Sequence, residues 1–435
     1  MKSCALAFLL LLSPALITGC ASHRQWRTSL EPCSTANETN ACQTAAIEKG
    51  SSYVLGFVEF DDQGWLWSRK QLNAVMDTLI QEEKDQRLII VAFVHGWKHT
   101  AKFDDSNVEL VRENLRFLNL VERLNSKREG RKPRKVVGVY AGWRGLSSKV
   151  WGMKELTFWE RKNTAQEVGR GGLSELFLRL EDLRNSSHII HAGETNQTRL
   201  FIIGHSFGGA ATFSALANTL AERSIQTVDL SGAGRPPRGV GDMVMLVNPA
   251  FEAARFGVLQ EIATSQTYLA SNLVNLAVFT SKTDNATKIA FPLGRYVSTL
   301  FENYQNSLER KANHTAIGHF PEFTTHDLLA TEIKKASKSV RLREQVDQAD
   351  AISKRATELK SQARNQARRS SEGDQSSVYH FIGSDLVLRP HRDPRMPLFV
   401  VSVDSRIIPD HNAIDEPEFR RFLAQFLTTF EPQDR

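Results

Sequence analysis

Residues Arg199–Gly209 read RLFIIGHSFGG, and this stretch decides the fold. The apolar run Leu200–Ile203 has the length and the β-branched content of a buried strand. The alanine-rich segment Ala210–Ala217 that follows has the composition of a helix. The Gly-x-Ser-x-Gly pattern between them is typical of a sharp strand-to-helix turn with a serine, Ser206, at its apex. We therefore expect a serine hydroxyl raised above the end of a buried strand.

Glycines surround Ser206 because such a turn leaves no room for side chains. A Cβ at Gly204 or Gly208 would clash with the strand or the helix, and Gly209 lets the helix start close to the sheet. The helix N-terminus behind the serine offers backbone amides to negative charge that develops in a reaction. These features indicate a nucleophilic serine. The alternative is a glycine-rich turn of another α/β protein, in which the serine only caps the helix.

Strand-like and helix-like segments alternate along the chain without an internal repeat. The alternation predicts an α/β fold with a doubly wound, mostly parallel sheet. The expected strands cover residues 53–60, 87–94, 136–140, 200–203, 243–247, 273–279 and 398–403. The expected helices cover residues 69–84, 105–128 and 416–430, a segment that ends near 183, the stretch after Ser206 and a short segment near 250–263.

More than a hundred residues separate Asp284 from the last expected strand. Residues 331–378 are rich in Lys, Arg, Glu, Gln, Ser and Ala, which predicts an exposed charged helix that grades into a flexible run at 370–377. Its apolar positions do not hold a heptad, so a solvated insertion is favoured over a coiled-coil surface for an unknown partner. The expected divisions are a leader (1–19), a tether (20–50), an α/β core (51–330), a charged helical insertion (331–390), and a closing part with the last strand, a histidine loop and a helix (391–435).

With its strand, glycine-framed serine turn and helix, the chain resembles the α/β-hydrolase superfamily over about residues 53–430. The resemblance implies the α/β-hydrolase fold and a catalytic set in the chain order nucleophile, acid, histidine, with Ser206 as the nucleophile. The acid is expected after the second strand beyond the serine strand, and the histidine after the last strand. The resemblance implies no metal and no organic cofactor.

Asp284 is the candidate acid. It is the one carboxylate in Thr280–Asn285, the loop after the expected strand at 273–279, and it would orient an imidazole and stabilise its charged form. The alternative role for this side chain is a cap on the next turn. Asp404 is the second candidate, but it ends the strand that leads to the expected histidine, with no strand between them.

His411 is the candidate base, because it lies after the last expected strand and before the last helix. It would take the proton of Ser206 and pass it to the leaving group. Three other histidines compete in the segment NHTAIGHFPEFTTH, and no expected strand precedes them, so we expect them to line the entrance or to pack internally. They are His314, His319 and His326, of which the last two are also candidates for substrate contact.

Two backbone amides are candidates for an oxyanion hole. One belongs to Phe207, directly after the serine, and the other to Trp97 in His95-Gly96-Trp97, which matches the HG-x pattern of the superfamily. Gly96 allows the backbone to turn, and His95 is expected to be a structural hydrogen-bond partner. The pattern is not the HGGG form of many lipases, so membership of that branch is not supported.

The first residues have the features of an export signal. Lys2 precedes an apolar run at 5–12 that is too short to span a bilayer comfortably. Ile17-Thr18-Gly19-Cys20 resembles a bacterial lipobox, which implies that Cys20 is lipidated and becomes the N-terminus. The alternatives are an uncleaved anchor and secretion with Cys20 unmodified. We expect a lipid-anchored protein of the bacterial cell envelope, and Ala21 favours the outer membrane in a Gram-negative host.

Two cysteines remain once the leader and its lipidation site are set aside. Cys33 and Cys42 form an even pair in an exported chain, so a small disulfide loop is expected, and two free thiols are the alternative. Their spacing is not that of a metal site. The net charge is +6, with basic residues dispersed among acids and without interleaved aromatics, so no nucleic-acid partner is expected.

The expected reaction is hydrolysis of a carboxylic ester through an acyl-enzyme on Ser206. The segment 143–159 carries four aromatic residues that either line an acyl pocket under a lid or pack in the core: Trp143, Trp151, Phe158 and Trp159. A lid would favour lipid-like esters. Two other functions stay open, an amidase or peptidase with the same residues and a non-catalytic envelope binding or assembly protein with the same fold. The complete candidate set argues against the non-catalytic function.

Overall fold

The structure, a computed structural model, describes residues 22–35, 40–146, 158–225, 238–265, 268, 274–331, 342–371 and 377–431. The expected leader, Cys20 and Trp151 lie outside these residues. The strands are β1 (Cys33–Ser34), β2 (Ile47–Lys49), β3 (Val54–Glu59), β4 (Leu88–Val94), β5 (Lys135–Gly142), β6 (Arg199–His205), β7 (Met243–Val247), β8 (Leu276–Ser281), β9 (His326–Ala330), β10 (Val378–Phe381), β11 (Ser384–Leu388) and β12 (Leu398–Val403). The longer helices are α2 (Arg69–Asp85), α3 (Ser106–Glu129), α5 (Phe158–Val168), α6 (Ser174–Ile190), α7 (Phe207–Ile225), α8 (Ala253–Ser265), α9 (Phe291–Ser298), α10 (Ser307–His314), α11 (Leu342–Ser371) and α12 (Pro417–Phe430).

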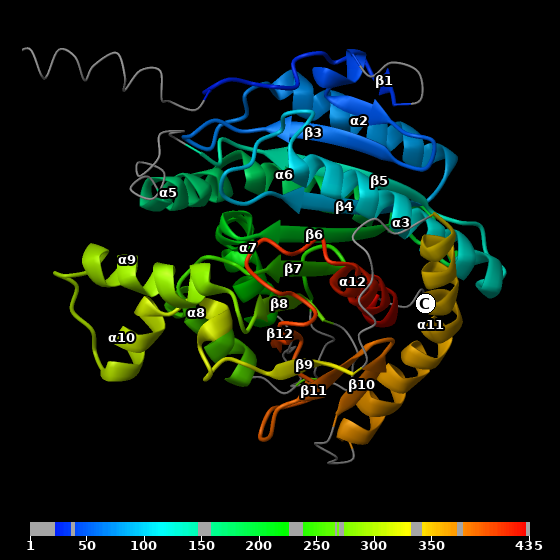
Figure 1. The fold of residues 1–435 in the computed structure, drawn as a ribbon. Coiled ribbons are helices and arrows are strands. Elements are labelled where there is room, and N and C mark those ends of the chain that lie inside the picture. The colour runs from blue at the N-terminus through cyan, green and yellow to red at the C-terminus, as the bar shows by residue number, and fades with distance from the viewer. Residues whose placement is uncertain are drawn as a thin grey trace, which may run out of the picture.

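The described strands form a single sheet in the order β1-β2-β3-β5-β4-β6-β7-β8-β12-β9-β11-β10 (Figure 1). Every neighbouring pair from β3 to β9 is parallel. Antiparallel pairs occur only towards the edges, between β2 and β3 and in the β9-β11-β10 ladder. The sequence predicts seven strands, and all seven lie in this sheet with small shifts at their ends. The mostly parallel α/β architecture is therefore confirmed.

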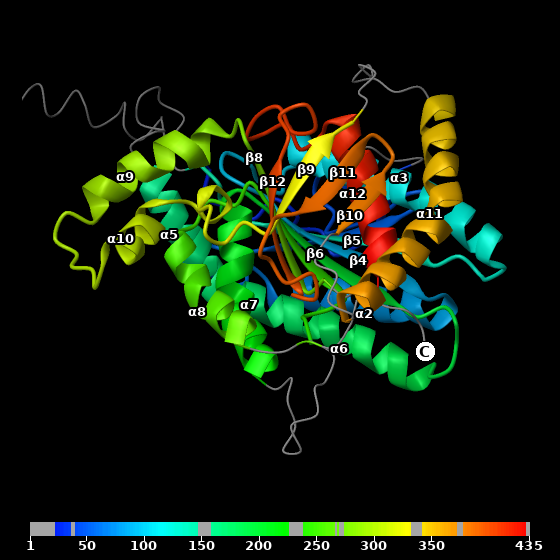
Figure 2. The same cartoon turned by 90° about the horizontal axis from the view of Figure 1, so that it is seen from below.

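Helices cover both faces of the sheet (Figure 2). The helices α2, α5, α6, α7 and α8 pack on one face and share one hydrophobic core with it. On the other face α3, α12 and α11 enclose a second core, rich in phenylalanine from α12. Because the sheet is covered on both sides, its central strands are continuous apolar runs, as in β4, where all seven residues are buried. No described helix is long and apolar enough to cross a bilayer.

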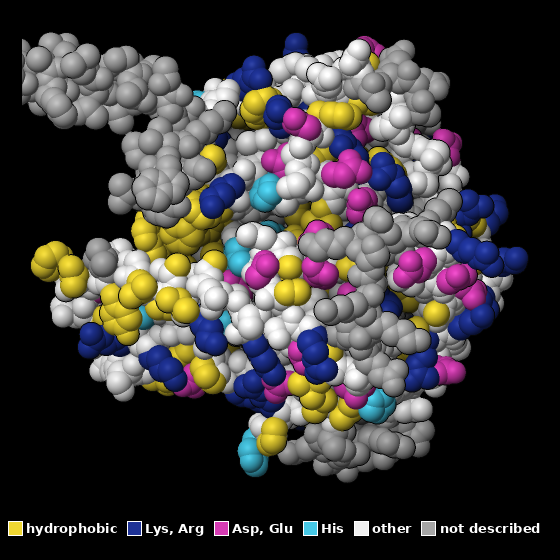
Figure 3. Space-filling model, viewed as in Figure 1, with side chains coloured by type: hydrophobic (Ala, Val, Ile, Leu, Met, Phe, Trp, Pro, Cys, Tyr) yellow, Lys and Arg dark blue, Asp and Glu magenta, His cyan; other side chains and the backbone are white. Residues whose placement is uncertain are grey.

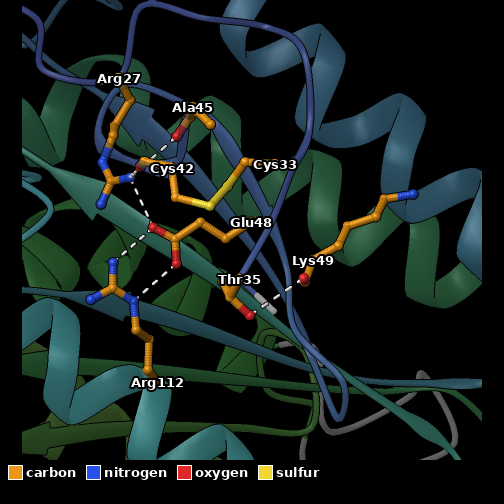
Figure 4. The surroundings of a disulfide bond; sticks show 8 residues. All are labelled: Arg27, Cys33, Thr35, Cys42, Ala45, Glu48, Lys49 and Arg112. Carbon is orange, nitrogen blue, oxygen red and sulfur yellow. Dashed lines mark hydrogen bonds and ion pairs between the residues drawn. A yellow bond between two sulfur atoms is a disulfide. The ribbon is translucent and has the colours of Figure 1, made fainter. Parts of the chain in front are cut away.

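The N-terminal segment is part of the fold and not the tether that the sequence predicts. Cys33 and Cys42 form a disulfide, and β1 and β2 beside it extend the sheet edge (Figure 4). The fully buried Arg27 forms an ion pair with Glu48, which also receives the guanidinium of Arg112 from α3 (Figure 4). A buried charge needs such partners, so this cluster fixes the segment to the sheet.

The segment predicted as a solvated insertion is also built into the fold. Helix α11 packs against α3 and α12 through a stripe of small and branched residues, Ala349, Ile352, Ala356, Leu359 and Ala363, all buried. The strands β9, β11 and β10 extend the sheet beyond β12. The predicted charged helix is thus present as α11, but one of its sides is buried and not solvated. The sequence does not reveal this side, because the alanines of the stripe do not stand out from a charged background. The run at 372–376 lies outside the described residues.

Candidate active site

Ser206 stands in a tight turn between β6 and α7. Its backbone has φ of +55°, a left-handed conformation that is unfavourable for a residue with a side chain. A Cβ at Gly208 would lie 2.1 Å from the carbonyl oxygen of Val94, and one at Gly204 would lie 2.6 Å from the hydroxyl of Thr212. These close approaches require glycine, as the sequence predicts. The turn lies at the carboxyl ends of β4 and β6, where the strand order reverses, and ligands of parallel sheets bind at such points.

The structure brings Ser206, His411 and Asp284 together in one hydrogen-bonded chain. The Oγ of Ser206 lies 2.7 Å from Nε2 of His411, and Nδ1 of His411 lies 2.9 Å from Oδ2 of Asp284. Asp284 follows β8, two strands beyond β6 in the sheet, and His411 follows β12. Since the carboxylate accepts a hydrogen bond from Nδ1–H, Nε2 is left to accept the hydrogen bond of the serine hydroxyl.

Asp284 is a buried carboxylate that stays ionised. Its Oδ1 accepts the backbone N–H of Thr287 at 3.1 Å, and its Oδ2 accepts the hydroxyl of the same residue. Burial raises the pKa of Asp284, but the hydrogen bond and charge of His411 and the hydrogen bonds from Thr287 outweigh it. The pKa of this carboxyl therefore lies below its usual range. The Thr287 hydroxyl also accepts a hydrogen bond from Nε2 of His319, at 3.0 Å.

Hydrogen bonds from side chains to backbone carbonyls hold the segment that ends at His411. In the His411 loop, defined here as residues 408–411, each carbonyl accepts a hydrogen bond from a side chain at the end of a central strand. Ser281 binds the carbonyl of Ile408 at 2.6 Å, and Thr283 binds that of Pro409 at 2.7 Å. Asn248, after β7, binds the carbonyl of Asp410 at 3.4 Å and that of His411 at 2.9 Å.

His205, next to Ser206, is the fourth of these carbonyl-binding side chains. Its Nε2 donates to the carbonyl of His411 at 2.9 Å. Burial, followed by the nearby charge of His411, lowers the pKa of His205 to about 3, so this ring is neutral at ordinary pH. The four positions Asn248, Ser281, Thr283 and His205 are absent from the set that the sequence predicts. No motif marks them, because they act on backbone groups from distant parts of the chain.

The loop after β4 passes directly over Ser206. A Cβ at Gly96 would lie 2.9 Å from the Cβ of Ser206, so this close approach requires glycine. The amide of Trp97 has no acceptor among the described residues. The amide of Phe207 belongs to the first turn of α7, where helical amides have no acceptor within the helix. The amides of Trp97 and Phe207, both candidates for the oxyanion hole, thus belong to segments that meet at Ser206.

His95 and Trp143 fix this loop from the core. Nδ1 of His95 donates to the carbonyl of Gly96 at 2.9 Å, while its Nε2 accepts the N–H of Trp143 at 3.0 Å. The Trp143 indole lies parallel to the imidazole and donates to the His95 carbonyl at 2.9 Å. Burial lowers the pKa of His95 to about 4. Trp143 is therefore a core residue and not part of a lid.

A cavity of about 610 Å³ opens above Ser206 and His411. Its apolar lining includes aromatic rings in contact with one another and consists of Trp97, Leu110, Phe158, Trp159, Ala250, Ala286, Ala290 and Ile414. Besides Ser206 and His411, its polar lining consists of Lys98, His99, Ser106, Asn107, Thr287, Asn412 and Asp415. Two of the four aromatic residues of segment 143–159 thus line the cavity. A cavity with both apolar and polar lining fits an amphiphilic molecule.

The alternative site residues lie elsewhere. Asp404 binds the guanidinium and backbone N–H of Arg406, which lower the pKa of this carboxyl to about 2. His314 is buried, with its ring stacked on Tyr296. His326 is buried beside Phe399 at the start of β9, a strand that the sequence does not predict. His319 reaches the site only through Thr287.

The described residues contain no group of three or more His, Cys, Asp or Glu side chains that could hold a metal ion.

No protein-family model matches the chain, and no curated protein matches it. Among solved structures, the chain is similar to the phospholipase PlaB from Legionella pneumophila in complex with thio-NAD, at 14% identity and a TM-score of 0.23. The match covers 57% of this chain and 47% of that chain, less than half its length. A likeness at this TM-score carries no argument about fold or activity.

Proposed function

We propose that this chain is a serine hydrolase of carboxylic esters with the α/β-hydrolase fold. The observation that carries the proposal is the hydrogen-bonded chain of Ser206, His411 and Asp284 at the wall of a cavity. A serine in a left-handed turn, an imidazole nitrogen at 2.7 Å and an ionised buried carboxylate behind it are what acyl transfer needs.

The proposed reaction has two halves. His411 takes the proton of Ser206 while Oγ attacks the ester carbonyl, and the imidazolium then gives that proton to the leaving alcohol. Asp284 stabilises the imidazolium and keeps its own charge. Water, deprotonated by the same nitrogen of His411, then attacks the acyl-enzyme, releases the carboxylic acid and restores the serine.

In the tetrahedral intermediate, the negative charge on the former carbonyl oxygen needs hydrogen-bond donors from the protein. We assign this role to the amides of Trp97 and Phe207, in the segments that meet at Ser206. Loss of one such donor costs about 10²–10³-fold in kcat in related chemistry. The apolar lining of the cavity would take the acyl chain and its polar residues the alcohol part, which favours lipid-like esters.

We also propose that the protein is held in the bacterial cell envelope by lipid on Cys20, and in the outer membrane of a Gram-negative host. The motif Ile17-Thr18-Gly19-Cys20 and the disulfide of an oxidising compartment support this. Expression with radioactive palmitate tests it. We expect label in the parent and none in Cys20→Ser, and an unlabelled parent would contradict the proposal.

A fluorophosphonate probe tests the hydrolase proposal, since it labels only activated serines. We expect labelling of the parent, none of Ser206→Ala, and labelling of His411→Ala slowed by at least about 10³-fold. Ser214→Ala is the matched control, because this serine lies two turns further along α7 and its hydroxyl binds a helical carbonyl. Labelling of Ser214→Ala should equal that of the parent.

A folded parent that takes no label would refute the proposed function. Nitrophenyl esters of rising chain length, with the matching anilides, then define the substrate. We expect faster turnover of esters than of anilides, and a rise with chain length because of the apolar lining of the cavity. Preference for the anilides would make the enzyme an amidase instead.

A further inference from the structure

Helix α9 exposes an apolar stripe to solvent. Together with the preceding turn η3 (Ala286–Ala290) and the following residues, it carries large side chains at helical spacing that the protein leaves uncovered. The exposed fractions are 53% for Ile289, 64% for Leu293, 52% for Tyr296, 72% for Leu300 and 98% for Phe301. We call these five residues the α9 ridge. In the space-filling view apolar side chains gather over α9 at the left of the molecule (Figure 3).

The opposite face of this segment is fixed to the protein. Phe291 is fully buried and lies against Trp159, and a Cβ at Gly294 would come within 2.1 Å of the same indole. Arg295 pairs with the buried Glu252 at 3.2 Å, which also pairs with Lys162 of α5. The ridge is therefore held outward and cannot turn inward to bury its apolar side chains. An exposed patch of this kind marks an interaction surface.

The charges around the ridge indicate its partner. From Ala286 to Phe301 the sequence has Lys288 and Arg295 and no carboxylate, and the exposed Glu302 that follows lies 3.8 Å from Arg295. Lys288 and, next to α9, Arg310 are exposed, and neither forms an ion pair with a described carboxylate. An outward apolar stripe flanked by free cations is complementary to a bilayer surface with anionic headgroups.

The ridge is continuous with the cavity of the candidate active site. Three residues of η3, namely Ala286, Thr287 and Ala290, line the cavity, while Ile289 of the same turn points to solvent. One short segment thus borders both the solvent-exposed apolar stripe and the space above Ser206.

We propose that the α9 ridge docks the protein on an anionic lipid surface and places the mouth of the cavity at that surface. An amphiphilic ester would pass from the bilayer to Ser206 along the apolar lining of the cavity. This delivery role rests on the proposed hydrolase function, whereas docking does not.

Vesicle flotation tests the docking. Because every described helix and strand lies after residue 22, the chain 22–435 is used, which lacks Cys20 and any lipid on it. We expect it to float with vesicles of phosphatidylglycerol in phosphatidylcholine, and less with phosphatidylcholine alone. The variant with Leu293→Ser, Leu300→Ser and Phe301→Ser should lower the partition coefficient by at least about tenfold, because interfacial binding scales with buried apolar area.

A matched control removes three equally exposed apolar side chains from α6 and α8: Ile189→Ser, Ile190→Ser and Val258→Ser. It should float as the parent does. Equal flotation of the ridge variant and the parent would overturn the proposal. Dimerisation of the parent in solution that the ridge variant loses would also overturn it, since the ridge would then join two copies of the chain.

Hydrolysis of a short, water-soluble nitrophenyl ester separates docking from the proposed reaction. The ridge variant should retain the parent rate on this ester and lose at least about tenfold on ester lipid in vesicles. A parent that floats but hydrolyses neither ester would refute the hydrolase function and leave docking intact. Equal rates of ridge variant and parent on vesicle lipid would overturn the delivery role.

Discussion

At the scale of single residues, the candidate site contains two kinds of side chain. Some are proposed to react, and the others hold them in place. Ser206, His411 and Asp284 form the hydrogen-bonded chain that we propose to react, and Thr287 extends it behind the carboxylate. Because Thr287 donates to an ionised oxygen, its hydroxyl stabilises the charge that His411 needs opposite it. His319 completes this contact from the far side.

Asp284→Asn should lower kcat by about 10⁴-fold with KM little changed, because a neutral amide cannot stabilise the imidazolium. Ester kinetics measure this. Asp404→Asn is the control, since Asp404 binds Arg406 and not His411. A large loss in Asp404→Asn with none in Asp284→Asn would reverse the assignment of the acid.

Thr287→Val should lower kcat by about tenfold to a hundredfold, the effect of one hydrogen bond to a charged group. Without the hydroxyl the pKa of Asp284 rises, so the acid limb of the rate profile should move to higher pH. Thr264→Val is the control, because that hydroxyl binds only carbonyls of α8. A fall in kcat with no movement of the acid limb would mean that Thr287 has a merely structural role.

The sequence predicts Ser206, Asp284 and His411, the residues that the structure brings together. Ser206 carries a local motif, and the resemblance to the α/β-hydrolase superfamily implies after which strands the acid and the histidine are expected. The sequence does not predict Asn248 or Thr283, which bind carbonyls more than a hundred residues away in the chain. Any donor of the right length serves that purpose, so no pattern marks it.

At the scale of elements, α11 packs against the core through a stripe of buried residues. The sequence does not reveal this stripe, because charged residues surround it. The buried residues of α11 recur at alternating steps of three and four, a heptad pattern with alanine at several positions, so the prediction that its apolar positions hold no heptad is wrong. Alanine is common on exposed helices as well, so composition predicts an exposed helix. The neighbouring strands β9, β10 and β11 are short and half-buried, and their weak alternation is lost beside the charged helix.

Ala356→Glu should destabilise the fold by about 2–3 kcal/mol, because it places a charge between α11 and its neighbours. Ala351→Glu, on the exposed side of the same helix, should cost less than about 0.5 kcal/mol. Urea unfolding measures both. Equal midpoints for the two variants would show that α11 does not pack as the structure has it.

Glu431 joins the end of α12 to Lys360 of α11 and to Arg134 before β5. Burial raises the pKa of Glu431, but the charges of Arg134 and Lys360 outweigh it and lower the pKa to about 2. The stability it contributes is therefore present above its unfolded pKa of about 4.5 and is lost as pH falls through about 2. Glu431→Gln should cost about 2–3 kcal/mol at pH 7 and nothing near pH 2.

Urea unfolding across this pH range measures the difference between Glu431→Gln and the parent. Glu261→Gln on α8, where the carboxylate is exposed, serves as the control and should match the parent throughout. A difference that does not change with pH would contradict the assignment to Glu431.

At the scale of the whole molecule, one continuous sheet connects the disulfide edge to the β9-β11-β10 edge, with the candidate site over its middle. The disulfide and the Arg27–Glu48–Arg112 cluster close one edge, several strands from Ser206 (Figure 4). Stability at this edge and activity at the centre should therefore vary independently.

The double variant Cys33→Ala with Cys42→Ala should lower the free energy of unfolding by about 2–3 kcal/mol, the value for a loop of this length. Its rate on a soluble ester should equal that of the parent. Reduction of the parent should give the same loss of stability, and reduction of the variant should change nothing. A fall in rate at full folding would show that the edge is coupled to the site.

The position of His411 depends on hydrogen bonds to the backbone carbonyls of residues 408–411 and not on the side chains of the residues before it. A backbone carbonyl is the same whatever side chain its residue carries, so the imidazole keeps its place through changes of sequence around it. Asn412, Ile414 and Asp415 follow at once and line the cavity. Substitutions at these three positions should therefore change the lining of the cavity without moving the imidazole.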